Sequence, residues 1–465
     1  MRVDVLCAEI GSTTTVVNAF SGIRTDNPHL EGQGFFRTTV LEGDVTVGLN
    51  AAMDDLKSHL QTDHLSWDRF LASSSAAGGL RMSVHGLVYD MTVRAAKEAA
   101  LGAGANIHQI TAGRMSRSDL KKLHENRPNI ILIAGGVDYG ERETALYNAE
   151  KIALLKLDIP VIYAGNLQNR EEIGEIFQNT GSPLYIVENV YPGIDRLEVQ
   201  PARKIIQTIF EEHIVHAPGM DKIRSLVDGP ILPTPGAVME ASLLLKENLG
   251  DLITFDVGGA TTDVHSVTEG SDDVNRIQLY PEPRAKRTVE GDLGVFINRM
   301  NVFALSDKKR MTRICGIKEE ELEDSVLALN ALPKNPQEGA LVSELTFTAL
   351  KTALHRHVGK YRDSFMAQGK KTGSEGRDLT AITTIVGTGG ALTRLDTGAS
   401  LLTEVFTQGH KKDLLPQALP RVLIDSSYIM ASLGVLSREY PEAAARLFSF
   451  YQAENQTRRV PHGGS

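Results

Sequence analysis

The stretch that decides the fold is LITFDVGGATTDV, residues 252–264. A short apolar strand runs into a turn of small, hydroxylated and acidic residues: Asp256, Gly258, Gly259, Thr261, Thr262 and Asp263. Glycines let backbone amides approach anionic oxygens, and hydroxyl groups add donors. A carboxylate at the strand end is suited to a metal ion or its water shell. The pattern indicates a phosphate-binding turn, although a glycine pair after a strand is also typical of a simple tight turn.

Two other stretches repeat this design. VDVLCAEIGSTTTVVNAF, residues 3–20, is a strand that ends in an acid and a glycine–hydroxyl turn: Glu9, Gly11, Ser12, Thr13 and Thr14. ITTIVGTGGALTRL, residues 382–395, is a strand followed by Gly387, Gly389, Gly390 and the start of a helix. Three such turns far apart in the sequence are unlikely to arise by chance, and they predict a phosphate site with Asp256 as a candidate metal ligand.

Length and composition limit the class of protein. A chain of 465 residues exceeds the size of one hydrophobic core, so two or more domains are expected. The net charge of -9 argues against a nucleic-acid partner. The sequence contains two cysteines, which argues against a disulfide framework and fits a reducing compartment. We find no signal peptide and no membrane-spanning stretch, and therefore expect a cytoplasmic protein without a membrane partner.

Residues 105–217 show a different pattern, in which short apolar strands alternate with amphipathic helices. This alternation predicts a parallel sheet covered by helices, whose ligands usually lie at the carboxyl ends of the strands. The residues at those ends are Gly135, Gly136, Asp138, Gly165 and Asn166. They are candidates for a binding face, but loop geometry explains them equally well.

Three local expectations concern the second half of the chain. A strand is expected near Ile277–Tyr280, and Gly369–Arg377 is expected to be a polar linker or exposed loop. The last residues, 456–465, are expected to be disordered.

The order of the three turns resembles the ATPase fold shared by actin, heat-shock chaperones and sugar kinases. The resemblance matches residues 9–14 and 256–263 to the two phosphate loops, 386–391 to the adenosine loop and 234–241 to a hinge helix. It also implies a nucleotide site with Glu9, Asp256 and Asp263 as catalytic candidates and with Glu9 and Asp256 as metal ligands. Glu290 and Asp292 would form an acidic loop near the nucleotide. Glu9 departs from the pattern, because the first loop usually begins with Asp. The extra methylene moves the carboxylate by about 1.5 Å, so Glu9 is expected to act through water or to matter less than Asp256.

The whole chain resembles the accessory proteins of glutamate (methylaspartate) mutase, the MutL/GlmL family. The resemblance lies in VDVLCAEIGSTTT, VHGLVYDMTVRAAKEAALGAGA, IILIAGGVDYGERETALYNAE, TFDVGGATTDVHSV and RTVEGDLG. It implies an ATP- and Mg²⁺-dependent, chaperone-like reactivating factor that releases damaged cobalamin from an adenosylcobalamin-dependent mutase. The family shares a name with a DNA mismatch-repair protein, but nothing in the sequence indicates DNA repair.

The resemblance implies an actin-like two-lobed α/β ATPase with a Rossmann-like insertion. The expected parts are a first lobe (1–104, 218–250 and 426–455), the insertion (105–217), a second lobe (251–425) and the tail (456–465). Two alternatives stay open: a small-molecule kinase of the same fold, and an assembly factor that senses a nucleotide without hydrolysing it. The sequence leaves the oligomeric state open.

Overall fold

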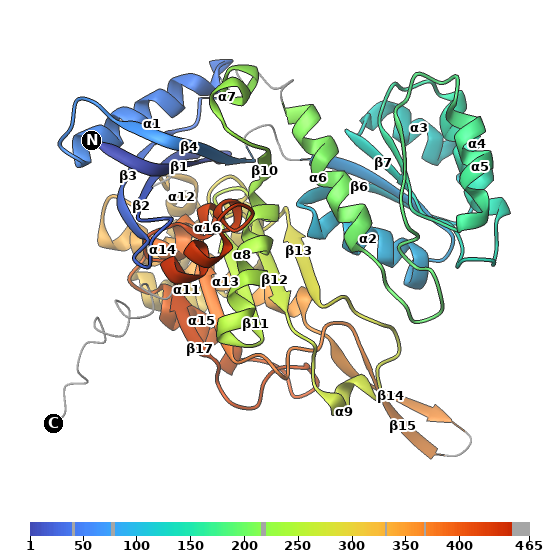
Figure 1. Ribbon diagram of the computed structural model, residues 1–465. Coiled ribbons are helices and arrows are strands. Elements are labelled where there is room, and N and C mark those ends of the chain that lie inside the picture. The colour runs from blue at the N-terminus through green and yellow to red at the C-terminus, as the bar shows by residue number, and fades with distance from the viewer. Residues whose placement is uncertain (40–41, 76–79, 215–219, 331–332, 367–368, 449–465) are drawn as a thin grey trace. The chain divides into compact units, whose positions relative to one another are not determined.

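The computed structural model describes residues 1–39, 42–75, 80–214, 220–330, 333–366 and 369–448 (Figure 1). The chain forms two compact units. Unit 1 contains Met1–Ala19, Glu31–Ala237 and Tyr280–Lys286, and unit 2 contains Phe20–Leu30, Val238–Leu279 and Arg287–Ser465. The expected boundaries of the lobes and the insertion stay predictions, and the tail at 456–465 lies outside the described residues.

The first sheet has the strand order β10-β4-β1-β2-β3. Its strands are β1 (Arg2–Ile10), β2 (Thr14–Ser21), β3 (His29–Arg37), β4 (Ser66–Ser74) and β10 (Ile231–Pro233). β4 pairs in parallel with both β1 and β10. Helix α1 (Val45–His59) approaches β3 closely, because a β-carbon at Gly34 would lie 2.1 Å from the Ala52 carbonyl oxygen. Only glycine permits this packing.

The second sheet has the order β13-β12-β11-β16-β17. Its strands are β11 (Leu252–Val257), β12 (Thr262–Val267), β13 (Ala285–Glu290), β16 (Thr384–Thr388) and β17 (Arg421–Ile424). When the five strands of each sheet are numbered in chain order, both sheets have the spatial order 3-2-1-4-5. In both, the first and fourth strands are parallel. This repeated arrangement confirms the expected actin-like α/β ATPase fold.

The third sheet is entirely parallel and has the order β6-β5-β7-β8-β9. Its strands are β5 (Leu80–Gly86), β6 (Ala105–Ala112), β7 (Ile130–Ile133), β8 (Val161–Tyr163) and β9 (Leu184–Ile186). This is a doubly wound order, as expected of a Rossmann-like region. The sheet begins at β5, so residues before 105 belong to it.

Helices cover both faces of the third sheet. They are α2 (Arg94–Gly102), α3 (Arg117–Asn126), α4 (Glu143–Leu154), α5 (Arg170–Phe177) and α6 (Gln200–Ile214). Within β7, Ile130 and Leu132 join the core that contains the α2 alanines, whereas Ile131 and Ile133 join the core of α4 and α5. Side chains alternate between the faces of a strand, so an all-apolar strand is one that is buried on both sides.

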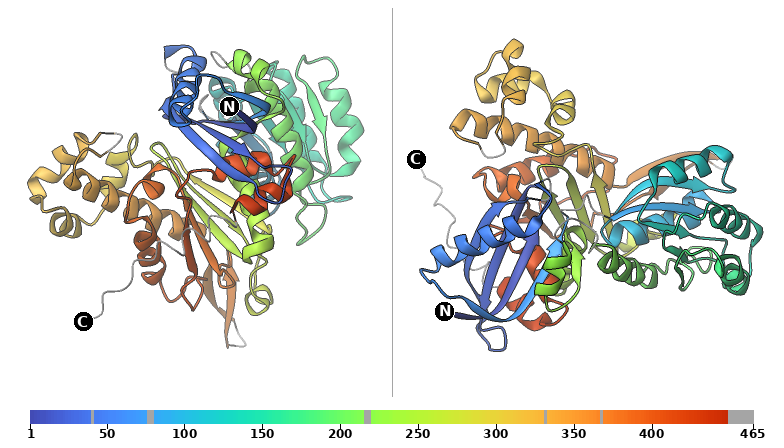
Figure 2. Two further views of the ribbon diagram at one scale, coloured as in Figure 1. Left: turned by 60° about the vertical axis from the view of Figure 1, so that its left-hand side comes forward. Right: turned by 90° about the horizontal axis from the view of Figure 1, so that it is seen from above.

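The remaining helices lie mostly in unit 2. They are η2 (Tyr89–Val93), η3 (Leu167–Asn169), α7 (Met220–Leu226), α8 (Thr234–Leu249), α9 (Asp272–Asn275), α10 (Arg299–Leu305), α11 (Lys308–Cys315), α12 (Glu319–Leu327), α13 (Pro336–His357), α14 (Gly390–Thr393), α15 (Gly398–Thr407) and α16 (Met430–Leu436). Both views of Figure 2 show α10–α12, in yellow to light orange, gathered beside the second sheet. Asn335 caps α13 by accepting the amide of Glu338 at 2.9 Å. This helix packs on β11, β12 and α15 and forms the centre of the unit 2 core.

Two local expectations are wrong. Ile277–Tyr280 is not a strand: it makes one isolated bridge, from Gln278 to Ser374, and the sheet strand lies later, at β13. Gly369–Arg377 is not a linker, because β15 (Gly369–Glu375) pairs with β14 (Lys360–Met366) in an antiparallel hairpin. GKKTGSE, the sequence of β15, has no apolar residue, so hydrophobic periodicity gives no signal there.

In the described part of the chain, no helix combines the length and the apolar composition that a membrane span requires.

Candidate functional site

The two predicted phosphate turns have the same backbone geometry. The Gly11 amide donates to the Thr14 carbonyl oxygen at 3.0 Å, and the Gly258 amide donates to that of Thr261 at 2.9 Å. A β-carbon at Gly11 would lie 2.7 Å from the Thr14 oxygen, so this turn requires glycine. The sequence therefore encodes one hairpin design twice, between β1 and β2 in unit 1 and between β11 and β12 in unit 2.

In the first turn, the predicted donors lie at the surface. Ser12 and Thr13 are exposed, and Thr14 is half-buried. The Thr13 carbonyl oxygen accepts the amide of Thr38 at 2.9 Å, which ties the turn to the chain after β3. Glu9 is 8% exposed and lies opposite Ser73 in the β1–β4 register. Its roles in catalysis and metal binding stay predictions.

In the second turn, the carbonyl groups are engaged and two amides are free. The Gly258 carbonyl oxygen accepts the Val295 amide at 3.2 Å, and that of Gly259 accepts the Ile297 amide at 2.7 Å. Among the described residues, no group accepts the amides of Gly259 and Ala260. Free adjacent amides on a glycine turn can bind an anion. This arrangement suits a phosphate oxygen.

The two acids of this turn differ in their surroundings. Asp256 and Asp263 face each other in the β11–β12 register. Asp263 is 4% exposed, and its Oδ1 accepts bonds from Arg287 Nε at 2.9 Å and Nη2 at 2.6 Å. Thr261 also donates to Asp263, at 3.2 Å, and the Thr262 hydroxyl donates to the Leu293 carbonyl oxygen at 2.8 Å. Asp263 and Thr262 thus have partners within the protein, and their contact with a nucleotide stays a prediction.

Asp256 is the half-buried acid at the end of β11. Burial, followed by the negative charge of Asp263, raises the pKa of Asp256 to about 7; Asp425 adds to this and Arg287 opposes it. A cation beside Asp256 would lower this pKa again, because it favours the charged carboxylate. Magnesium at nucleotide sites uses one or two carboxylates together with phosphate oxygens and water, so Asp256 is a suitable ligand. Among the described residues, no group of three His, Cys, Asp or Glu side chains could hold a metal ion.

The third turn touches the second. Gly389 has φ +86°, and a β-carbon there would lie 2.6 Å from Asp256 Oδ1 and 2.5 Å from the Val257 carbonyl oxygen. A β-carbon at Gly387 would press against the side chains of Leu392, Leu402 and Ile424, whereas one at Gly390 would meet nothing within 4 Å. The structure therefore brings the predicted adenosine and second phosphate loops together in unit 2.

Asp425 is a site residue that the sequence analysis missed. It follows β17 and accepts the Thr388 hydroxyl at 2.9 Å and the amides of Ile429 and Met430 at 3.0 and 2.9 Å. Burial raises the pKa of Asp425, although these donors oppose the shift. The sequence RVLID, residues 421–425, could have indicated Asp425, since Asp after an apolar run is typical of a helix start.

The acidic loop is held by an arginine that the sequence analysis also missed. Arg356, near the end of α13, donates to Glu290 at 2.6 Å and to both Asp292 oxygens at 2.8 and 3.0 Å. Burial raises the pKa of Glu290, and the Arg356 hydrogen bond lowers that of Asp292. A β-carbon at Gly294 would lie 2.2 Å from the Ala260 carbonyl oxygen, so this loop contacts the second phosphate turn. Whether Glu290 and Asp292 touch a nucleotide stays a prediction.

The polar and glycine residues after the strands of the third sheet make contacts between neighbouring loops. Asp138 Oδ1 accepts the Leu167 amide at 2.9 Å and an Asn189 amide proton at 3.0 Å. A β-carbon at Gly165 would lie 2.4 Å from the Gly135 nitrogen, so the neighbouring loops pack backbone to backbone. These contacts account for the glycines and polar residues without a ligand.

Comparison with known proteins gives the following matches. A family model described as MutL protein matches residues 5–451. Protein MutL of Clostridium tetanomorphum is 33% identical over 463 residues, which cover 96% of this chain and 98% of that protein. A nucleotide-free acetone carboxylase structure has a TM-score of 0.39 and 12% identity, over 94% of this chain and 70% of that chain. A nucleotide-free diol dehydratase-reactivating factor has a TM-score of 0.34 and 11% identity, over 96% and 99% of the two chains. The strand order of the first and second sheets identifies the fold.

Proposed function

The chain belongs to the MutL protein family, and on this basis we propose that it is an ATP-dependent, chaperone-like reactivating factor. In this proposal it releases damaged cobalamin from an adenosylcobalamin-dependent mutase, with glutamate mutase as the partner. The proposal rests on the resemblance of the sequence to glutamate mutase accessory proteins and on the chemistry of the glycine turns.

The observation that carries the ATPase part is the contact of two glycine turns around Asp256. One turn offers the free amides of Gly259 and Ala260, and the other approaches so closely that Gly389 cannot carry a side chain. A nucleotide needs donors for its phosphates and close backbone contact, and these two turns offer both.

In the proposed mechanism, the Gly259 and Ala260 amides bind phosphate oxygens, and Thr261 positions Asp263 through its hydroxyl group. Arg287 holds Asp263 in place, since it supplies two donors to one oxygen. Asp256 and, by the sequence resemblance, Glu9 would hold Mg²⁺, which offsets phosphate charge when bound. Asp256 would also orient the attacking water, since no side chain of the described residues hydrogen-bonds it.

Nucleotide chemistry can drive release only if the chain binds the mutase with different affinity in its ATP and ADP states. A radical enzyme that has lost its adenosyl group keeps inert cobalamin in a closed site. In the proposal, one nucleotide state of this chain binds the open form of the mutase more tightly and thereby favours loss of the damaged cofactor.

Steady-state ATP hydrolysis tests this function. We expect slow hydrolysis by the chain alone and faster hydrolysis when cobalamin-inactivated glutamate mutase is added. Asp256→Ala should lower both rates by roughly 10²-fold or more, as expected for loss of a metal or phosphate organiser. Hydrolysis that depends on a small-molecule acceptor would instead indicate a kinase, and ATP binding without turnover would indicate a nucleotide-sensing assembly factor.

A further inference from the structure

Buried ion pairs join α2 to residues Tyr280–Lys286 within unit 1. Lys286 Nζ lies 2.8 Å from Glu282 Oε2 and 3.5 Å from Glu98 Oε1. Glu282 also pairs with Arg94, and we call these four residues the Lys286 cluster. The side chains of Glu98 and Glu282 are only 4% and 5% exposed. Loss of one partner from such a cluster leaves a buried charge uncompensated.

Arg203 of α6 holds the backbone of the same segment. Its Nη2 donates to the Ala285 carbonyl oxygen at 2.7 Å and to that of Glu98 at 3.4 Å. Gly102, the last residue of α2, makes room for this side chain, because a β-carbon there would lie 2.2 Å from Arg203 Nε. Helices α2 and α6 therefore hold Ala285 through its backbone and Lys286 through its side chain.

The next residue in the chain, Arg287, belongs to unit 2 and to the second phosphate turn. It is 1% exposed and donates two bonds to Asp263 Oδ1, at 2.9 and 2.6 Å. Thr261 of the turn donates to the same carboxylate at 3.2 Å. Successive residues of a strand point to opposite faces, and Lys286 and Arg287 are neighbours in β13. One strand thus carries both the Lys286 cluster and the partner of Asp263.

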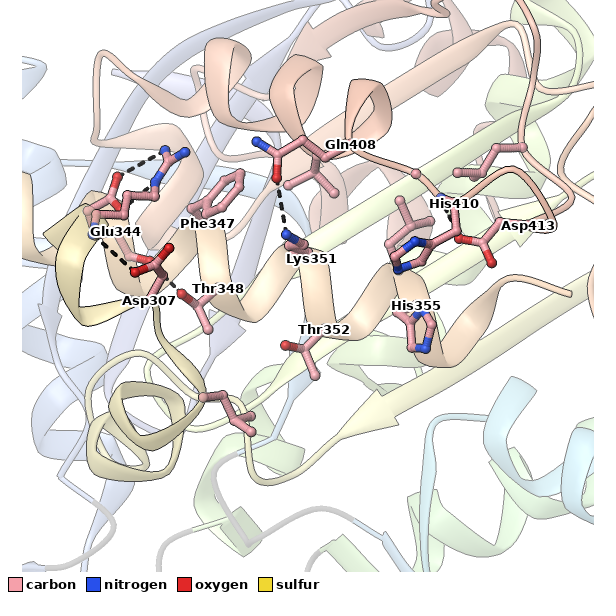
Figure 3. Close-up of a pocket in the computed structure, with 16 residues that line it drawn as sticks. Asp307, Glu344, Phe347, Thr348, Lys351, Thr352, His355, Gln408, His410 and Asp413 are labelled. Atoms are coloured by element: carbon pink, nitrogen blue, oxygen red, sulfur yellow. Dashed lines mark hydrogen bonds and ion pairs between the residues drawn. The ribbon is translucent and has the colours of Figure 1, made fainter. Parts of the chain in front are cut away.

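A comparable ion-pair cluster lies entirely within unit 2. Arg310 binds Glu344 at 2.7 Å and also pairs with Glu404, beside a cavity of about 300 Å³ along α13 (Figure 3). The three residues belong to α11, α13 and α15, which share one core. Those pairs fix neighbouring helices to one another, whereas the pairs of Lys286 hold a strand that continues to the phosphate turn.

We propose that residues 282–287 transmit the nucleotide state of the second phosphate turn to α2 and α6. A phosphate on this turn adds negative charge near Asp263, and the Arg287 guanidinium, with its five donors, responds to both charges. Lys286 and the Ala285 carbonyl group follow Arg287 along the strand. Because separating buried charges from their partners is costly, Glu98 and Arg203 shift with them.

This transmission rests on the proposed function, and it names the part of the chain that responds to the nucleotide. Reactivation requires an affinity for the mutase that differs between nucleotide states. Helices α2 and α6 pack in one core on the third sheet, together with Leu132 of β7. A shift of these helices changes the surface that this region presents to a partner, and this change would supply the difference in affinity.

Hydrogen–deuterium exchange of the full chain tests the transmission. Exchange is measured without nucleotide and with Mg²⁺ and AMP-PNP, an ATP analogue that resists hydrolysis. We expect the analogue to slow exchange at residues 256–263. We also expect it to change exchange at residues 94–102 and 200–210 by about threefold or more.

Lys286→Met removes the charge that ties the strand to α2. The phosphate turn should still respond to the analogue, whereas α2 and α6 should lose their response, because Glu98 and Glu282 no longer follow the strand. The matched control is Lys121→Met, which breaks a pair with Glu125 on α3. The Lys121 side chain is 76% exposed, so this variant should respond as the wild type does.

Gly102→Ala is a second variant that keeps every charge. Its methyl group would displace the flexible end of Arg203 from the Ala285 carbonyl oxygen. We expect the response of α2 and α6 to fall by about twofold or more. Gly174→Ala is its control, because a β-carbon at this position in α5 would meet nothing within 4 Å. Circular dichroism checks that each variant folds.

A wild-type response that is confined to residues 256–263 would overturn the transmission and leave ATP binding at the turn standing. A full response of α2 and α6 in folded Lys286→Met, or in folded Gly102→Ala, would also overturn it. No response at residues 256–263 in the wild type would contradict the proposed nucleotide site, and the transmission would fall with it.

Discussion

The α-carbon of Gly389 lies so close to β11 that a β-carbon there would come within 2.6 Å of Asp256 Oδ1. Gly389 also has φ +86°, a conformation that side chains with a β-carbon rarely adopt. Two glycine turns that are 130 residues apart in the chain thus meet at one carboxyl group. This contact is the geometric centre of the proposed nucleotide site in unit 2.

Gly389→Ala should therefore disturb Asp256 and weaken ATP binding. Both the positive φ and the close contact oppose a methyl group, and Asp256 must shift to admit it. We expect at least about tenfold weaker binding of ATP by calorimetry. Gly339→Ala is the matched control, because its β-carbon in α13 would meet nothing within 4 Å. Equal affinity of the two variants would contradict the assigned contact.

The buried pair of Arg287 and Asp263 should be sensitive to loss of one partner. Arg287 is 1% exposed, so Arg287→Met leaves the Asp263 carboxylate buried without its main donor. We expect a loss of roughly 3–5 kcal/mol in the free energy of unfolding, measured with urea. Arg362→Met breaks an exposed pair with Glu375 and should cost only about 0–1 kcal/mol. Similar losses of unfolding free energy in both variants would show that the buried Arg287–Asp263 pair stabilises the fold no more than an exposed pair does.

His85 should make the protein sensitive to acid. It is fully buried in β5, where burial lowers its pKa to about 4. The unfolded chain binds this proton near pH 6.5, so the neutral ring favours folding above that pH, and this contribution is lost as the pH falls toward 4. Between pH 7.5 and 5.0 the loss should be roughly 2 kcal/mol.

Urea unfolding of His85→Gln at the two pH values measures this effect. The variant lacks the titrating group, so its stability should fall less between pH 7.5 and 5.0 than that of the wild type. His124→Gln, which changes an exposed side chain on α3, should keep the wild-type dependence. An unchanged pH dependence in His85→Gln would assign the acid sensitivity to other groups.

Arg356→Met should loosen the acidic loop. Arg356 is the shared partner of Glu290 and Asp292, whose charges would repel each other without it. We expect faster amide hydrogen exchange at residues 290–298, while the β14–β15 hairpin exchanges as in the wild type. Unchanged exchange at 290–298 would mean that the contacts of Gly294 and Asn298 with Ala260 hold the loop alone.

The sequence predicts the parts of the site that depend on local chemistry. Gly11 and Gly258 each follow an apolar strand and lie three residues before a threonine, and this pattern encodes the same hairpin turn twice. The all-apolar strand at Ile130–Ile133 likewise predicts a sheet that is covered on both faces. Strand periodicity and turn residues act over a few positions, so one sequence is enough to recognise them.

The parts that depend on distant partners could not be predicted. Arg356 is 66 residues from Glu290 and 64 from Asp292, and no local pattern pairs them. Asp263 and Thr262 stay predicted ligand contacts, and no local pattern shows that Arg287 and the Leu293 carbonyl group also engage them in the fold. The β14–β15 hairpin is polar, and its formation depends on strand pairing that hydrophobic periodicity does not show.

Recovery of an inactivated mutase directly tests the proposed release of damaged cobalamin. Glutamate mutase blocked with cyanocobalamin is incubated with this protein, ATP, Mg²⁺ and fresh adenosylcobalamin, and mutase turnover is followed. We expect mutase activity to return with ATP, and not to return without ATP or with Asp256→Ala. Full recovery without ATP, or equal recovery with Asp256→Ala, would contradict the proposed reactivase function.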